Sequence, residues 1–93
     1  MLKSVEYSTR ARNHLKKIKA HIAQDNEIAA LRVVTHITTE ADLLAEFPMI
    51  GKSGEIDGTR ELVLSKYPYT IIYRLTSSKV RIVAVLHQSQ DHA

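Results

Sequence analysis

The sequence contains no cysteine, so neither a disulfide framework nor a zinc site with thiolate ligands is available to it. No apolar run approaches the roughly 18 residues that a membrane-spanning helix needs. The first residues, MLKSVEYSTR, lack the basic and then apolar layout of a secretory signal. We therefore expect a cytoplasmic protein that does not enter a membrane.

The common catalytic and metal-binding signatures are also missing. There is no Walker loop, no nucleophile elbow and no dinucleotide-binding glycine turn. No two of the five histidines stand at the i, i+4 spacing of a helical metal pair, and the carboxylates form no obvious dyad. We expect no cofactor and no metal. His87 is the one histidine placed where a site could form, and a structural role is its alternative.

The chain has the length and composition of one small domain, residues 1–93, with 44% apolar and 25% charged residues. A chain of this size buries only about 60–65% of its unfolded surface, so a partner that binds the folded form would stabilise it. The net charge of +3 favours encounters with acidic partners such as nucleic acid or an acidic protein tail.

The first half of the chain predicts a strand and two helices. Residues 2–7 contain β-forming side chains, and Ser8 then offers a hydroxyl that can cap a helix. One apolar stripe at helical spacing ends near Gln24, and a second ends before Pro48. The stripes consist of Ala11, Leu15, Ile18 and Ile22, and of Ala30, Val34, Ile37, Ala41 and Leu44. The short turn between them predicts an antiparallel hairpin.

The second half predicts three strands, at residues 60–64, 69–76 and 79–87. All three glycines precede them within eight residues and indicate a turn-rich connection. Alternation places one set of side chains of the last strand on a single face, namely Val80, Ile82, Ala84 and Leu86. The predicted fold class is α+β, in which a strand and a helical hairpin precede a three-stranded antiparallel meander, with the helices on one face of the sheet.

Basic residues near the predicted sheet are candidates for an anion site. Arg60 and Arg74 come from neighbouring strands and could converge on a phosphate or carboxylate, which a planar guanidinium suits. The alternative is that each arginine pairs with a nearby acidic residue or is simply solvated. The acidic residues within reach are Glu55, Asp57 and Glu61.

Several short segments of this half occur together in a distinctive order. They are Phe47-Pro48, Gly51-Lys52-Ser53-Gly54, Gly58-Thr59-Arg60-Glu61-Leu62, Pro68-Tyr69, Tyr73-Arg74 and Val85-Leu86-His87. With the β-α-α-β-β-β layout, they resemble the ParE/RelE toxin superfamily of type II toxin–antitoxin systems. The resemblance implies a toxin that acts in growth inhibition or plasmid stabilisation. It also implies a cognate antitoxin that wraps the helical hairpin and the sheet in a hetero-oligomer.

The superfamily includes two activities, and the cationic positions distinguish them. RelE-type toxins cut messenger RNA on the ribosome, with clustered lysines and arginines that stabilise developing charge. When the chain is aligned with RelE-type toxins through Tyr69 and Tyr73, the cationic positions of those toxins are occupied by Glu61, Val63, Thr70 and Gln90. Four replacements argue against this mechanism. If the chain is an endoribonuclease, its basic site would consist of Lys52, Arg60, Arg74 and His87.

ParE-type members, which resemble the chain more closely through Gly-Thr-Arg-Glu-Leu and the Pro-Tyr step, poison DNA gyrase. That resemblance implies an inhibitory binding protein rather than an enzyme. Residues 88–93 lack the arginine and the aromatic residue that family members place after Val-Leu-His. Three hypotheses follow: a gyrase-binding toxin, a ribosome-dependent endoribonuclease, and a scaffold that only sequesters its antitoxin.

Overall fold

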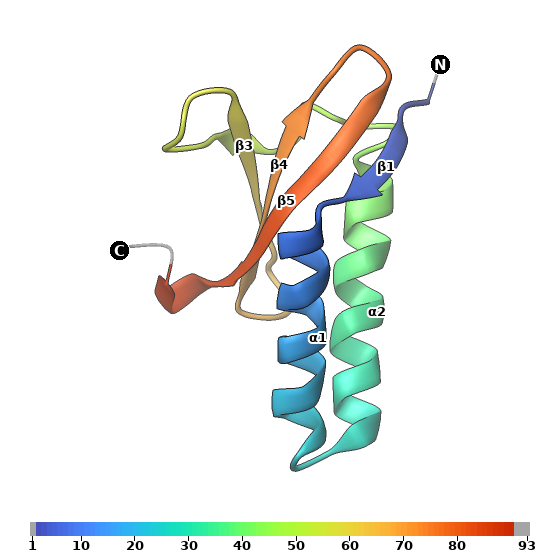
Figure 1. The fold of residues 1–93 in the computed structure, drawn as a ribbon, viewed down its shortest axis with the longest axis vertical. Coiled ribbons are helices and arrows are strands. Elements are labelled where there is room, and N and C mark those ends of the chain that lie inside the picture. Colours follow the sequence, from blue (N-terminus) through green and yellow to red (C-terminus); the bar gives the residue numbers. More distant parts are fainter. Residues whose placement is uncertain (1, 91–93) are drawn as a thin grey trace.

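A computed structural model describes residues 2–90, and its helices and strands form two layers (Figure 1). The elements are β1 (Ser4–Tyr7), α1 (Thr9–Ala23), α2 (Glu27–Leu43), β2 (Lys52–Ser53), β3 (Thr59–Val63), β4 (Tyr69–Leu75), β5 (Lys79–His87) and the 3-10 helix η1 (Gln88–Gln90). The helices stand side by side, and α1 packs against both α2 and β5. The predicted α+β class and the helical hairpin are confirmed.

The strands form one sheet in the order β1-β5-β4-β3-β2. β3, β4 and β5 make the antiparallel meander that the sequence predicts. β1 pairs with β5 in parallel, so the sheet is mixed, and β2 adds an antiparallel edge that was not predicted. A parallel pair requires a long crossover, which the helical hairpin supplies.

Each helix begins at a side chain that satisfies a free backbone N–H. The Ser8 hydroxyl accepts a hydrogen bond from the Ala11 amide at 3.0 Å, and the Asn26 side chain accepts one from the Ala29 amide at 2.9 Å. The predicted capping by Ser8 is confirmed, and so is the predicted turn near Gln24.

The core lies between the helices and one face of the sheet. Its largest fully buried side chains include Tyr73, Ile37, Leu44 and Ile71. The apolar stripe of α1 packs there as predicted. On α2, Val33 is buried in place of the predicted Val34, which is only half-buried. No helix within residues 2–90 combines the length and the apolar character needed to cross a membrane.

A β-bulge makes the predicted face of β5 wrong beyond Ile82. Tyr73 pairs with Ile82, but the preceding residue of β4 pairs with Ala84, so Val83 is an extra residue in β5. The alternation therefore reverses, and Val85 joins the core in place of Ala84. Because of this reversal, the His87 side chain points toward the helices.

Candidate functional site

The register of the sheet separates the two arginines that were expected to converge. Arg60 pairs with Tyr73, whose side chain is buried in the core, whereas Arg74 pairs with Thr59. Neighbouring residues of a strand point to opposite faces, so the two guanidinium groups leave the sheet in opposite directions. The expectation that they meet at one anion is wrong.

Arg60 instead holds the segment that follows α2. Its guanidinium donates hydrogen bonds to the Gly51 carbonyl at 2.7 Å and to the Met49 carbonyl at 3.1 Å. The buried Tyr73 hydroxyl reinforces this segment, because it donates to the Pro48 carbonyl at 2.8 Å and accepts from the Gly51 amide at 3.0 Å. These contacts give Arg60 a structural role.

The other residues of the predicted basic site lie apart from Arg60. Arg74 donates to the Asp57 carbonyl at 3.1 Å, and Lys52 is exposed on β2 opposite Glu61. His87 pairs with Tyr69, whereas Arg60 pairs with Tyr73. These two tyrosines are four residues apart on β4, a separation of about 13 Å at roughly 3.3 Å per residue. The structure does not bring the four residues together.

Three of the four positions that correspond to RelE-type cations occupy the face of the sheet turned away from the helices. Val63 and Thr70 pair directly, and Glu61 lies two residues along the same strand as Val63. Thr70 is fully buried, while the Glu61 carboxylate accepts a hydrogen bond from the Glu55 amide at 3.3 Å. Gln90 ends η1, and its side chain lies outside the described part.

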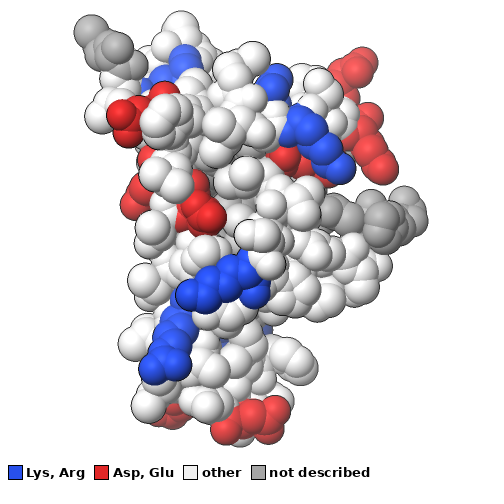
Figure 2. Space-filling model, turned by 180° about the vertical axis from the view of Figure 1, so that it is seen from behind, with Lys and Arg blue, Asp and Glu red and all other residues white. Residues whose placement is uncertain are grey.

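On the face shown in Figure 2, charged side chains occur in small groups that are separated by wide uncharged areas. One group of charges joins β1 to β5: the Glu6 carboxylate accepts from Lys79 at 2.9 Å and from Arg81. The hydrogen bond from Lys79 is the main reason that the pKa of Glu6 lies below its ordinary value. This group could not be predicted, because it depends on the parallel pairing of β1 with β5.

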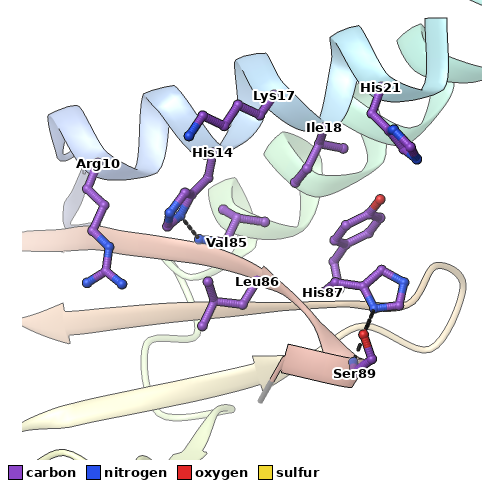
Figure 3. Close-up of a pocket in the computed structure, with 10 residues that line it drawn as sticks. Arg10, His14, Lys17, Ile18, His21, Val85, Leu86, His87 and Ser89 are labelled. Atoms are coloured by element: carbon purple, nitrogen blue, oxygen red, sulfur yellow. Dashed lines mark hydrogen bonds between the residues drawn. The ribbon is translucent and has the colours of Figure 1, made fainter. Parts of the chain in front are cut away.

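An open groove of about 730 Å³ lies between α1 and the end of β5 (Figure 3). Its lining consists of Arg10, His14, Lys17, Ile18, His21, Tyr69, Val85, Leu86, His87 and Ser89. In Figure 3, Arg10 and His14 reach from α1 toward β5 at one end, while His21 and His87 lie on the two walls at the other. Of the three histidines in this lining, the sequence placed only His87 where a site could form. The available signal for His14 and His21 was their spacing of seven residues, which places them on one side of a helix.

His14 connects the two walls of this groove. Its Nδ1 accepts a hydrogen bond from the Val85 amide at 3.2 Å, on the part of β5 beyond the residues that pair with β1. Burial lowers the pKa of His14, and the positive charges of Arg10 and Lys17 lower it further. His14 is therefore held as a neutral hydrogen-bond acceptor.

His87 is fixed on the opposite wall by its own neighbours. Its Nδ1 accepts from the Ser89 amide at 3.1 Å and lies 2.8 Å from the Ser89 hydroxyl. Its ring meets the Tyr69 ring edge-on, with centroids 5.4 Å apart. Within residues 2–90 no three His, Asp or Glu side chains are grouped so that they could hold a metal ion.

A second groove, of about 540 Å³, lies between α2 and the β3–β4 turn, and its character is mixed apolar and basic. Ile28 and Leu31 are 66% and 57% exposed there, and Lys66 lies 5.7 Å from the centre of the Tyr67 ring. Further exposed apolar side chains surround the other end of α2, namely Leu43, Phe47, Met49 and Ile50. Apolar groups gathered in this way are typical of interaction surfaces.

Comparison with known proteins gives a family match over residues 5–92, to the ParE toxin of type II toxin–antitoxin systems, parDE. The chain is 46% identical over 89 residues to a protein of Sinorhizobium fredii described as a toxin (Y4kP), covering 96% of this chain and 92% of that protein. It is 35% identical over 86 residues to the toxin RelE2 of Caulobacter vibrioides, covering 92% of this chain and 96% of the relative.

A solved structure of the chromosomal ParDE system from P. aeruginosa has a similar fold. Its TM-score is 0.83 at 21% identity, and the match covers 92% of this chain and 96% of that chain. At this identity the likeness concerns the fold alone. The relatives carry both ParE and RelE names, so their names do not decide between the two activities.

Proposed function

Because the chain belongs to the ParE toxin family of type II toxin–antitoxin systems, we propose that it inhibits growth by binding DNA gyrase and is neutralised by a cognate antitoxin. On this proposal it is an inhibitory binding protein. Its target surface is formed by side chains that recognise another protein, and no bond of a substrate is broken.

One observation carries the preference for binding over RNA cleavage. The sheet face at which RelE-type toxins need cations presents a carboxylate, an exposed valine and a buried threonine, namely Glu61, Val63 and Thr70. Electrostatic catalysis requires preorganised positive groups at the scissile phosphate. The alternative basic residues do not compensate, because Arg60 is bound to two carbonyls and lies on the opposite face from Arg74.

The exposed apolar side chains along α2 support the antitoxin part of the proposal. They occur at both ends of the helix, with Ile28 and Leu31 at its start and Phe47 and Met49 just beyond its end. A small domain gains stability from a partner that binds only its folded form. The P. aeruginosa chain with the similar fold comes from a toxin–antitoxin system, which fits a partner of this kind.

The test compares two targets under the same conditions. We expect the purified chain to stop supercoiling by DNA gyrase at near-stoichiometric ratios and to leave ribosome-bound message intact. Supercoiling should recover when the antitoxin is added. Cleaved codons with normal supercoiling would overturn the proposal in favour of an endoribonuclease, for which the 35% identity to RelE2 is the specific support. A folded chain with neither activity would leave the scaffold hypothesis.

A further inference from the structure

The net positive charge of the molecule comes from α1. This helix holds five of the thirteen lysines and arginines and none of the ten carboxylates, so the rest of the chain carries eight cations against ten anions. The first turn of α1 has no acidic residue and instead contains Arg10. The helix dipole disfavours a cation at that end, so helix stability does not explain Arg10.

Part of this charge faces the groove between α1 and the end of β5. Arg10, His14, Lys17 and His21 follow one another at spacings of four, three and four, which places them on one side of the helix. His87 stands across from them, and none of the carboxylates within residues 2–90 lines the groove. Within the described part of the chain, neither Arg10 nor Lys17 forms a salt bridge.

We propose that this groove binds the phosphodiester backbone of a single-stranded nucleic acid. Arg10 and Lys17 supply permanent charge to the phosphates, while His21 lies at the far end of the groove and His87 forms part of the opposite wall. The proposal goes beyond gyrase binding and does not depend on it. The groove also differs from three of the RelE-type positions, Glu61, Val63 and Thr70, which lie on the opposite face of the sheet.

The dimensions and the walls favour a nucleic-acid strand as the ligand. From Arg10 to His21 the helix rises about 16 Å, at roughly 1.5 Å per residue, which accommodates more than one phosphate. Ile18, which is half-buried, provides apolar surface between the charged ends, against which a base can lie. A cationic groove with apolar and aromatic side chains is the usual design of single-strand binding sites.

The lowered pKa of His14, which lies in the groove, is consistent with a groove that is positively charged before any ligand binds. Burial lowers the pKa of His14, and the positive charges of Arg10 and Lys17 lower it further. A phosphate in the groove would offset those two charges. His14 itself is occupied by the Val85 amide, so we assign it to positioning the wall rather than to binding.

The experiment measures binding by fluorescence anisotropy, with labelled single-stranded RNA and DNA of about 12 nucleotides, a length within the usual range for such sites. The test variant is Arg10→Gln/Lys17→Gln. The matched control is Arg12→Gln/Lys16→Gln, which removes the same charge from the same helix at exposed positions that do not line the groove. Circular dichroism checks that both variants fold.

We expect the Arg10/Lys17 variant to bind roughly tenfold more weakly, and the control within about twofold of the unmodified chain. The slope of log affinity against log salt should fall by about 1.4 in the test variant, since each phosphate contact contributes roughly 0.7. Comparing RNA with DNA shows which strand is preferred.

Three outcomes would overturn the proposal. Equal weakening in both variants would mean only general attraction to a basic helix. Tighter binding of an acidic peptide of similar length, with the same loss on Arg10→Gln/Lys17→Gln, would assign the groove to a protein partner. A lack of binding by the unmodified chain at low salt would exclude the site. Gyrase inhibition is measured separately, so its failure is distinguishable from each of these.

Discussion

Two buried tyrosine hydroxyl groups have opposite surroundings, and they allow a controlled test at the residue scale. The Tyr73 hydroxyl bonds to the Pro48 carbonyl and the Gly51 amide, whereas the buried Tyr7 hydroxyl has no hydrogen-bond partner within residues 2–90. Tyr73→Phe leaves the Gly51 amide unpaired and should lower the free energy of unfolding by about 1–3 kcal/mol. Urea denaturation measures it.

Tyr7→Phe is the matched control, because it also removes one buried hydroxyl. It should change the free energy of unfolding by less than about 0.5 kcal/mol, or raise it, since no hydrogen bond is lost. Similar losses in both variants would contradict the role assigned to Tyr73. Burial raises the pKa of Tyr7 to about 12, with a further contribution from Asp42, so the Tyr7 ring stays neutral during the measurement.

His14 gives the stability of the protein a defined dependence on pH. Its pKa in the folded state is lowered from the ordinary value of 6.5, so the unfolded chain takes up a proton there first. This contribution to stability is fully present above pH 6.5. It is lost as the pH falls from 6.5 through the pKa that His14 has in the folded protein. Glu6 affects stability in a different pH range. Because its pKa is lowered in the folded protein, its contribution to stability is lost only as the pH falls below 4.5.

The test compares the unmodified chain with His14→Gln, which keeps an acceptor for the Val85 amide but cannot titrate. Between about pH 7.5 and about pH 5, the unmodified chain should lose more free energy of unfolding than the variant. Parallel pH profiles for the two proteins would show that His14 is not the group responsible.

At the element scale, Ser8 does more than cap a helix. Its hydroxyl accepts from the Ala11 amide and donates to the Val83 carbonyl at 3.1 Å, so it ties α1 to the bulge of β5. Ser8→Ala should cost about 1–2 kcal/mol, and Asn26→Ala, which removes a cap alone, about 0.5–1 kcal/mol. Equal losses in thermal or urea unfolding would mean that the contact with the bulge contributes nothing.

The same elements show which features a sequence reveals. The caps at Ser8 and Asn26, the apolar stripes and the stop at Pro48 depend on residues within a few positions of each other, and they were predictable. The bulge at Val83 was not, because every residue from 79 to 87 suits a strand and only the partner strand shows which one is extra. That single insertion decides that His87 faces α1 and so helps to form the groove.

The candidate site was less predictable than the fold for a related reason. Arg60 and Arg74 are adjacent in the sheet, and only the register, in which Arg60 pairs with Tyr73, reveals that they diverge. The groove joins side chains about 70 residues apart, such as His14 and Val85, whose amide donates to the imidazole. No local pattern records that contact.

At the scale of the whole molecule, charge and apolar surface are distributed over different parts. The excess positive charge lies on α1, whereas most of the exposed large apolar side chains within residues 2–90 lie along α2 and just beyond its end. This division lets one small domain present two surfaces without competition between them. A partner that covers α2 can leave the groove beside α1 open, and the antitoxin and nucleic-acid proposals can therefore be tested independently.

The last prediction concerns the apolar surface of α2. The double variant Ile28→Gln/Leu31→Gln removes two side chains that are 66% and 57% exposed, so the fold should keep its stability within about 1 kcal/mol. Its affinity for the antitoxin should fall at least about tenfold, because buried apolar contacts at the centre of an interface carry most of its binding energy. Titration calorimetry with purified antitoxin measures this loss.

Val63→Gln is the control, since that apolar side chain is 48% exposed but lies on the sheet face turned away from the helices. It should leave antitoxin affinity within about twofold, equivalent to roughly 0.4 kcal/mol. If the control weakens binding as much as the α2 variant, the antitoxin contacts the outer face of the sheet. If neither variant has an effect, the antitoxin binds elsewhere, and the exposed surface of α2 requires a different partner.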